Sequence, residues 1–190
     1  MLPGFSGYSQ KSCFENATAY RFKYLNQTPI EFDSLLIYLK QGQNMLIGCT
    51  FPNDTFITIN NKHLALDSFA GKMLIITFWS KYCPPCVNEI PSFHELQKKY
   101  KNLVVLAFTL DSKPEAAEFL KKTSFKAEIM PDARDFVEKY SLGSGYPFTL
   151  LTDGARKILF AKSGGKTGPE NQMDLYNELQ PYIEESLKKH

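Results

Sequence analysis

The sequence predicts an α/β fold in which helices cover both faces of a mixed central sheet. From residue 48 onward, short apolar runs alternate with amphipathic stretches, the order that places helices on both faces of a sheet. Residues 73–80 form an almost continuous apolar run, which is typical of a strand buried on both faces. Asp153-Gly154 separates two further strand-like runs and favours a tight hairpin turn, so the sheet includes antiparallel pairs.

Each expected element rests on its own pattern of apolar residues. We expect strands at residues 56–59, 73–80, 103–110, 127–130, 148–151 and 157–161, and helices at residues 84–100, 114–122, 136–140 and from Pro169 onward. Asn60-Asn61 predicts a turn, and residues 64–69 a connection. The apolar face of the last helix should hold Met173, Tyr176, Leu179 and Ile183, with a kink at Pro181.

Residues 1–47 have a different pattern from the rest. Tyr20, Phe22 and Tyr24 alternate with charged residues, which is the period of a half-buried strand, whereas residues 32–39 carry apolar side chains at helical spacing. We therefore divide the chain into an N-terminal extension, residues 1–47, and a main domain, residues 48–190. The extension either packs on the main domain as an extra strand and helix, or is the remnant of a larger upstream domain.

Composition narrows the classes of partner. The 22 basic and 20 acidic residues are spread along the 190-residue chain, so no basic surface for nucleic acid or anionic lipid stands out. No stretch approaches the roughly 20 apolar residues that span a bilayer. The first seven residues lack the basic start and apolar middle of a signal peptide. The protein is therefore expected to be cytosolic, or its export signal lies outside this sequence.

Cys83-Pro84-Pro85-Cys86 follows the buried strand and opens an amphipathic stretch, which is the placement of a dithiol redox site. Because a helix N-terminus carries partial positive charge and free N–H groups, it stabilises a thiolate. We therefore predict that Cys83 is the attacking sulfur. Cys86, about one turn further along, would resolve a mixed disulfide formed at Cys83.

The other cysteines and the histidines leave two alternatives to weigh. A zinc site is disfavoured because the sequence has no second CxxC, and His63, His94 and His190 are scattered surface residues. We expect no metal, and no cofactor besides the redox-active cysteine pair. Cys13 and Cys49 form a structural disulfide if the compartment is oxidising, or else are two small buried apolar side chains; their spacing does not decide.

The segment Phe78-Trp79-Ser80-Lys81-Tyr82-Cys83-Pro84-Pro85-Cys86 resembles the active-site segment of the thioredoxin superfamily. Residues 86–91 are most similar to its TlpA-like, or ResA-like, thiol-disulfide oxidoreductases. Further likeness covers residues 48–188: the strand that opens the family's domain (48–56), Gly71-Lys72, an inserted βα unit (102–130), the cis-proline segment (145–149) and the turn at Asp153-Gly154. The resemblance implies a thioredoxin-like fold.

The resemblance also implies roles for single residues. The nucleophile falls on Cys83, the resolving cysteine on Cys86, the cis-proline on Pro147 and a helix-kinking proline on Pro91. A cis Pro147 would expose the Tyr146 backbone, so that a substrate polypeptide could pair with it beside the dithiol.

Glu89 resembles the glutamate that TlpA-like proteins place near their dithiol. Burial would raise its pKa and make it a proton acceptor for Cys86; the alternative is a solvated helix residue. Thr77 stands where thioredoxin has a buried aspartate, so that route for protons is absent.

Substrate contacts are assigned to residues around the dithiol and the cis-proline. The assigned residues are Trp79, Tyr82, Pro84, Pro85, Tyr146 and Pro147. Tyr82 replaces a tryptophan usual in the superfamily, and Tyr146 replaces a threonine or another small residue. Both tyrosines would alter substrate choice or redox potential, or they simply cover apolar surface.

The predicted function is a thiol-disulfide oxidoreductase that reduces protein disulfides. Pro84 and Pro85 offer no N–H to the Cys83 thiolate, which stabilises the reduced form less and favours a reductant, although Lys81 acts in the opposite direction. The expected partners are protein dithiols and disulfides and an upstream thiol electron donor. The resemblance implies an extracytoplasmic compartment, where that donor would be a membrane thiol carrier.

Two alternative functions and one partial nucleotide-binding motif are weighed against this prediction. A peroxiredoxin-like thiol peroxidase would fit Ser80 but not Ile76, which stands where such enzymes carry a proline. A non-catalytic thioredoxin-like binding module would not need both cysteines. Residues 163–168 end like a phosphate-binding loop, but Phe160 replaces its earlier glycine, so we expect a flexible turn into the last helix.

Overall fold

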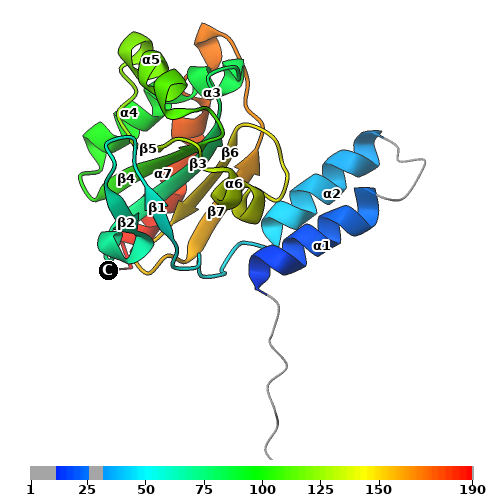
Figure 1. Cartoon of the computed structure of the whole chain (residues 1–190). Coiled ribbons are helices and arrows are strands. Elements are labelled where there is room, and N and C mark those ends of the chain that lie inside the picture. The colour runs from blue at the N-terminus through cyan, green and yellow to red at the C-terminus, as the bar shows by residue number, and fades with distance from the viewer. Residues whose placement is uncertain (1–11, 26–31, 190) are drawn as a thin grey trace, which may run out of the picture.

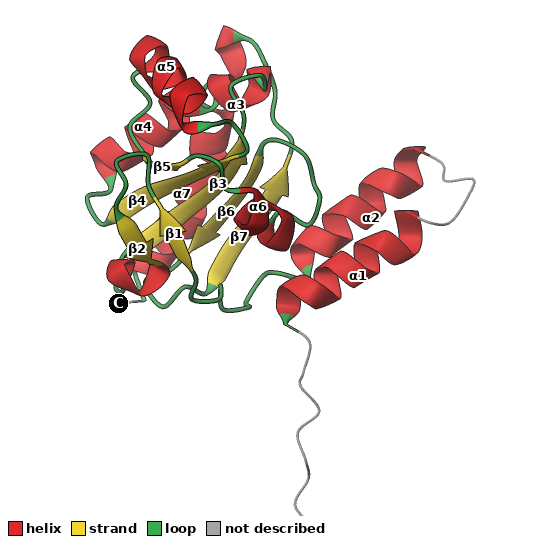
Figure 2. Cartoon of the chain, in the orientation of Figure 1, coloured by secondary structure: helices red, strands yellow, loops and turns green. Residues whose placement is uncertain are grey.

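A computed structural model describes residues 12–25 and 32–189. Its centre is a five-stranded sheet with helices on both faces (Figures 1 and 2). In sheet order, the strands are β5 (Glu128–Met130), β4 (Leu103–Thr109), β3 (Met73–Trp79), β6 (Phe148–Thr152) and β7 (Ile158–Ser163). Strands β3, β4 and β5 are parallel, whereas β6 runs antiparallel to both β3 and β7. The predicted mixed α/β sheet is therefore confirmed.

Strand β3 is the core of the molecule because all seven of its side chains are buried. Leu74, Ile76 and Phe78 belong to one apolar cluster, in which α6 (Arg134–Tyr140) packs on the sheet and the Phe108 and Phe136 rings stack 3.8 Å apart. Met73, Ile75 and Trp79 belong to the cluster on the opposite face. Buried side chains there come from α4 (Ile90–Lys99), α5 (Lys113–Thr123) and α7 (Asp174–Leu187), and Cys86 adds one from the short helix before α4.

Several boundaries differ from the sequence prediction. The helix expected over residues 84–100 is two helices, α3 (Pro84–Asn88) and α4, because Pro91 has no N–H to continue the first. The last helix begins later than expected: a 3-10 turn, η2 (Pro169–Asn171), precedes α7. Leu175, Leu179 and Ile183 form the buried face of α7, whereas Met173 and Tyr176 are only half-buried.

The connections around the sheet also differ in detail. Residues 63–65 form a strand, β2 (His63–Ala65), that pairs with β1 (Thr55–Ile57) in a separate hairpin and leads into η1 (Leu66–Phe69). The opening strand expected within residues 48–56 is reduced to β1 and one bridge between Thr50 and Lys157. The β6–β7 turn is wider than two residues, because Arg156 adopts a left-handed φ of 64° and its N–H bonds the Asp153 carbonyl.

The N-terminal extension is a helical hairpin of α1 (Cys13–Leu25) and α2 (Phe32–Asn44), which lie side by side (Figure 1). The strand predicted at residues 20–24 is therefore wrong. Phe14 and Ala17 are buried at helical spacing and Phe22 is exposed, so a five-residue alternation was too short to decide the period. The helix predicted over residues 32–39 is confirmed. The domain division at residue 48 stays a prediction.

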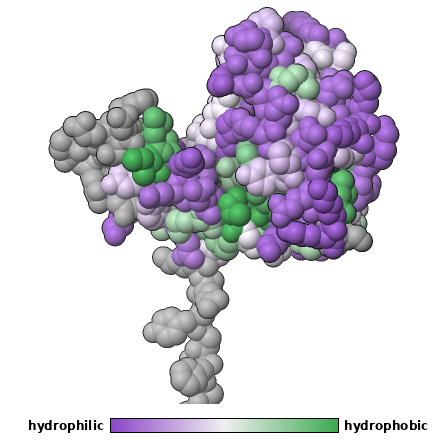
Figure 3. Space-filling model, turned by 180° about the vertical axis from the view of Figure 1, so that it is seen from behind, coloured by the Kyte–Doolittle hydropathy of each residue, from purple (hydrophilic) through white to green (hydrophobic). Residues whose placement is uncertain are grey.

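Within the described residues, no helix combines the length and apolar character needed to cross a membrane. The rear face of the main body is mostly hydrophilic, with apolar side chains in small patches (Figure 3). On the hairpin and the segment that follows it, Phe22, Leu36, Ile37, Met45 and Ile47 are exposed.

A disulfide joins Cys13, at the start of α1, to Cys49, which follows α2. The Cys49 carbonyl accepts the N–H of Ile158 at the beginning of β7, and the Gly48 N–H bonds the Ile158 carbonyl. Of the two alternatives for this cysteine pair, the structure shows the bridge. It fastens the hairpin to the edge of the sheet.

Replacing both Cys13 and Cys49 with serine is expected to lower the free energy of unfolding by about 3–4 kcal/mol, because the bridge closes a long loop in the unfolded chain. Urea denaturation followed by circular dichroism measures the difference. In excess dithiothreitol, which opens the bridge of the native protein too, native protein and variant should unfold at nearly the same urea concentration. Equal stability under oxidising conditions would contradict a structural role.

Candidate active site

Cys83 and Cys86 form a disulfide at the N-terminus of α3, directly beyond the end of β3. Cys83 is the N-cap residue and is half-buried, whereas Cys86 is 5% exposed. The Cys86 N–H donates to the Cys83 sulfur over 3.2 Å. Because Pro84 and Pro85 carry no N–H, Cys86 supplies the backbone donor of this first turn, as the sequence predicts. The accessible sulfur is therefore that of Cys83.

Asp111 anchors the loop that leads into the dithiol. Its carboxylate, 7% exposed, accepts the Ser80 hydroxyl over 3.0 Å and the Lys81 N–H over 2.7 Å. Asp111 follows β4, and the parallel pairing of β3 with β4 brings the ends of both strands to one edge of the sheet. The sequence analysis missed Asp111, although an acidic residue directly after a buried strand was the signal that could have identified it.

Lys81 is held by an acidic and an aromatic neighbour. Its ammonium lies 2.9 Å from the Glu115 carboxylate and 4.6 Å from the centre of the Tyr82 ring. These contacts raise the pKa of Lys81, and the same ion pair is the main cause that lowers the pKa of Glu115 to about 2. Because Glu115 neutralises this charge locally, Lys81 stabilises a Cys83 thiolate less than an isolated lysine would.

Glu89 lies at the joint between α3 and α4 and is 7% exposed. Burial is the main cause that raises the pKa of its carboxyl to about 8; Lys162 opposes this shift and Glu178 adds to it. One carboxyl oxygen, Oε2, is buried without a hydrogen-bond partner. The side chain is therefore not a solvated helix residue, and it is mostly protonated at neutral pH.

The loop of residues 163–168 packs against Glu89. A Cβ atom at Gly165 would lie 2.7 Å from Glu89 Oε1 and 3.3 Å from side-chain atoms of both Pro85 and Pro147, so a larger residue there would displace the Glu89 carboxyl. The Gly164 N–H donates to the Pro147 carbonyl over 2.8 Å. The sequence analysis treated this segment as a flexible turn and missed its place in the site. Its contacts are non-local and leave no local pattern.

Pro147 follows a cis peptide bond and lies just before β6, and the half-buried Tyr146 precedes it. Burial is the main cause that raises the pKa of Tyr146. Of the other residues assigned to substrate contacts, Tyr82 and Pro84 are exposed and Pro85 is half-buried. Trp79 is only 3% exposed and packs on Phe119 and Phe125, so it supports the site from the core.

Two further residues of the sequence analysis have defined surroundings. Thr77 is buried in β3, and its hydroxyl lies 3.0 Å from that of Thr149 on β6, so the two threonines satisfy each other within the core. His94 Nε2 accepts the Lys126 N–H over 3.0 Å, and His63 is exposed. His190 lies outside the described residues. Within the described part of the chain, no cluster of three or more potential metal ligands exists.

The sequence profile of the AhpC/TSA family matches residues 47–161. This chain belongs to the AhpC/TSA family. It is 30% identical over 134 residues to a thiol-disulfide oxidoreductase ResA of Bacillus cereus, a match that covers 68% of this chain and 77% of that protein. A ResA of another Bacillus cereus strain is 27% identical over 143 residues, with 73% and 81% covered. The chain therefore belongs with the ResA-like proteins, and the predicted resemblance is confirmed.

The fold of this ResA-like chain also matches solved structures. A putative thiol:disulfide interchange protein DsbE from Chlorobium tepidum superposes with a TM-score of 0.62 at 22% sequence identity. The match covers 72% of this chain and 97% of that one. At this identity the likeness shows the fold alone, and the thioredoxin-like fold predicted from the sequence is confirmed.

Glu89 should make the stability of this protein depend on pH. Its pKa is raised from an ordinary 4.5 to about 8, so the folded state disfavours the ionised form. The contribution of the neutral carboxyl to the free energy of unfolding is complete below pH 4.5 and is lost as pH rises through about 8. The total loss is up to about 5 kcal/mol. Urea denaturation of oxidised native protein from pH 5 to 9 measures this decline, which a Glu89→Gln variant should lack. Parallel curves for the two proteins would contradict a buried, neutral Glu89.

Proposed function

We propose that this protein reduces disulfide bonds in other proteins, with the Cys83–Cys86 pair as the redox carrier. The observation that carries the proposal is the asymmetry of the pair. Cys83 is accessible at the N-terminus of α3, whereas Cys86 is buried beside it on the helix that leads to Glu89. A reactive thiolate at the surface and a protected second thiol are what successive attack and resolution require.

The chemistry proceeds in two exchanges. In the reduced protein, the Cys83 thiolate attacks one sulfur of a substrate disulfide; a mixed disulfide forms and the other substrate sulfur leaves as a thiolate. The Cys86 thiol then loses its proton, and its sulfur attacks Cys83. This step forms the Cys83–Cys86 disulfide and releases the second substrate thiolate. Two electrons pass from the protein to the substrate, and each released thiolate takes a proton.

Glu89 is the proposed proton acceptor for Cys86. At neutral pH the carboxyl is mostly protonated, so the proton passes in the minority of molecules in which Glu89 is ionised. Because its pKa of about 8 is close to that of an ordinary thiol, that transfer has little cost in free energy. Burial also keeps bulk water away from the carboxyl. A substrate polypeptide would lie along the Tyr146 backbone, which precedes the first paired residue of β6, while the Pro147 carbonyl is already bonded to Gly164.

The proposed direction of transfer follows from the few groups that stabilise the Cys83 thiolate. The Cys86 N–H donates to its sulfur, two prolines contribute no N–H, and Lys81 is paired with Glu115. A weakly stabilised reduced form gives a low reduction potential, which suits a reductant. The Cys13–Cys49 bridge supports an oxidising, extracytoplasmic compartment. There, an upstream thiol protein, such as a membrane thiol carrier, would return the electrons.

The reduction potential of the Cys83–Cys86 couple is expected at about −270 mV or lower. Equilibration in defined dithiothreitol buffers, followed by alkylation and peptide mass spectrometry, reads each cysteine separately and so distinguishes this couple from Cys13–Cys49. A Cys13→Ser, Cys49→Ser double variant is the matched control and should have the same potential at the dithiol. A value near −120 mV would sink the proposed direction and indicate an oxidase or isomerase.

A Cys86→Ser variant should accumulate a mixed disulfide with a protein substrate at Cys83, because the resolving sulfur is missing. Non-reducing electrophoresis and mass spectrometry detect the adduct, and a Cys83→Ser variant, in which the remaining sulfur of the pair is buried, should form none.

Peroxide consumption by the reduced native protein distinguishes a disulfide reductase from a thiol peroxidase, and it is expected at the background rate. Full disulfide reduction by the Cys83→Ser variant would favour a non-catalytic dithiol.

A further inference from the structure

Arg21 joins the N-terminal hairpin to the main body close to the active site. From α1, its Nη1 atom donates to the Leu142 carbonyl over 2.7 Å and to the Ser144 hydroxyl over 2.5 Å. These partners lie 121 and 123 residues further along the chain. The guanidinium is half-buried, and burial lowers its pKa. Hydrogen bonds from a desolvated cation are stronger than those between neutral groups.

The loop that receives Arg21 adopts a backbone conformation that needs support from contacts. Leu142, Gly143 and Gly145 all adopt positive φ angles, of 55°, 60° and 73°. Two glycines leave the unbound loop many alternatives, and a leucine rarely adopts this region. Its shape is held from within by the Ser144 N–H on the Ser141 carbonyl and by the buried Leu142 side chain. From outside, Arg21 holds it on one side, and the Ser163 hydroxyl donates to the Ser144 carbonyl over 3.0 Å on the other.

This loop leads directly into the segment that a substrate polypeptide would contact. Ser144 is two residues before Tyr146, and the same end of β7 that binds Ser144 also places Gly164 on the Pro147 carbonyl. A displacement of the loop would therefore move the Tyr146 backbone relative to Cys83.

The hairpin is already attached elsewhere, so the Arg21 contact is not its principal anchor. The Cys13–Cys49 disulfide ties the beginning of α1 to the sheet, and Phe14 and Ala17 are buried in the core. Arg21 lies one to two turns further along α1 than these residues. Its contacts order a loop beside the site more than they hold the helix.

We propose that Arg21 is a positioning residue through which the N-terminal hairpin sets the loop that presents Tyr146 and Pro147, and thereby selects polypeptide disulfides over small ones. The inference rests on the proposed function. A polypeptide must pair with the Tyr146 backbone, so its binding depends on the loop. A small disulfide needs only access to the Cys83 sulfur, so its reduction does not.

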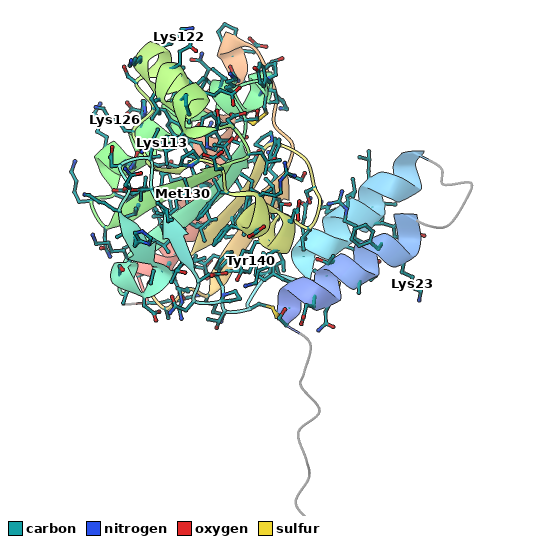
Figure 4. The ribbon with its side chains drawn as sticks, in the orientation of Figure 1. Lys23, Lys113, Lys122, Lys126, Met130 and Tyr140 are labelled. Atoms are coloured by element: carbon teal, nitrogen blue, oxygen red, sulfur yellow. A yellow bond between two sulfur atoms is a disulfide. The ribbon has the colours of Figure 1, made fainter. Side chains whose placement is uncertain are left out.

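The test compares reduction of insulin, a polypeptide disulfide, with reduction of dithiobis(nitrobenzoate), a small one. Arg21→Ala should raise the KM for insulin about tenfold with kcat within about twofold, and leave the small disulfide within about twofold. Arg21→Lys keeps the charge and one donor group, so its KM should lie between those of native protein and Arg21→Ala. Lys23→Ala is the matched control, because Lys23 lies on the same helix and points away from the body (Figure 4). It should behave as native protein.

Ser144→Ala removes one of the two acceptors and completes a double-mutant cycle. Alone it should raise the insulin KM less than Arg21→Ala, and combined with Arg21→Ala it should add nothing further. Additive effects, an unchanged insulin KM in Arg21→Ala, or equal losses on both disulfides would overturn the role assigned to Arg21. Native protein that reduces neither disulfide would instead overturn the proposed function and, with it, this inference.

Discussion

The burial of β3 on both faces is the constraint on which the rest of the structure depends. All its side chains but that of Thr77 belong alternately to the two apolar clusters, so the strand cannot shift by one residue without exchanging the two sets. Trp79 ends the strand inside one cluster, and the chain then has four residues in which to reach the start of α3. The dithiol is therefore placed by the packing of the core, and Asp111 holds the short connection in one conformation.

The Cys83 sulfur and the Glu89 carboxyl, both positioned by this packing, lie in contrasting environments. Cys83 is partly exposed beside the exposed Tyr82, whereas the Glu89 carboxyl is buried against the loop that carries Gly165. The same backbone joint that ends α3 and begins α4 directs Glu89 inward. Pro91 is thus one cause of the raised pKa of Glu89, since it creates the joint between the two helices that lets this carboxyl be buried.

The sequence predicted what depends on neighbours along the chain and failed where contacts are non-local. The apolar run from Met73 to Trp79 predicted a buried strand, and the spacing of the CPPC motif predicted a helix N-terminus after it. The structure confirms both elements. The prediction for the hairpin was half wrong, because residues 20–24 fit two periods and only the burial of Phe14 and Ala17 in the core of the main body decides for the helix. Gly165 and Arg21 could not be recognised, since each matters through residues that the fold brings from far along the chain.

The two disulfides, Cys13–Cys49 and Cys83–Cys86, lie at opposite ends of the sheet. Strand β7 runs in the same direction as β3, so Cys49, beside the first residue of β7, is about a strand's length from Cys83, beyond the last residue of β3. In the proposed reaction, the Cys83–Cys86 bond opens in every turnover while the Cys13–Cys49 bond stays closed. A protein that delivers electrons in this reaction must therefore open the dithiol and leave the Cys13–Cys49 bond closed, so the surroundings of each bond, through its accessibility and reduction potential, decide whether the hairpin stays attached to the sheet.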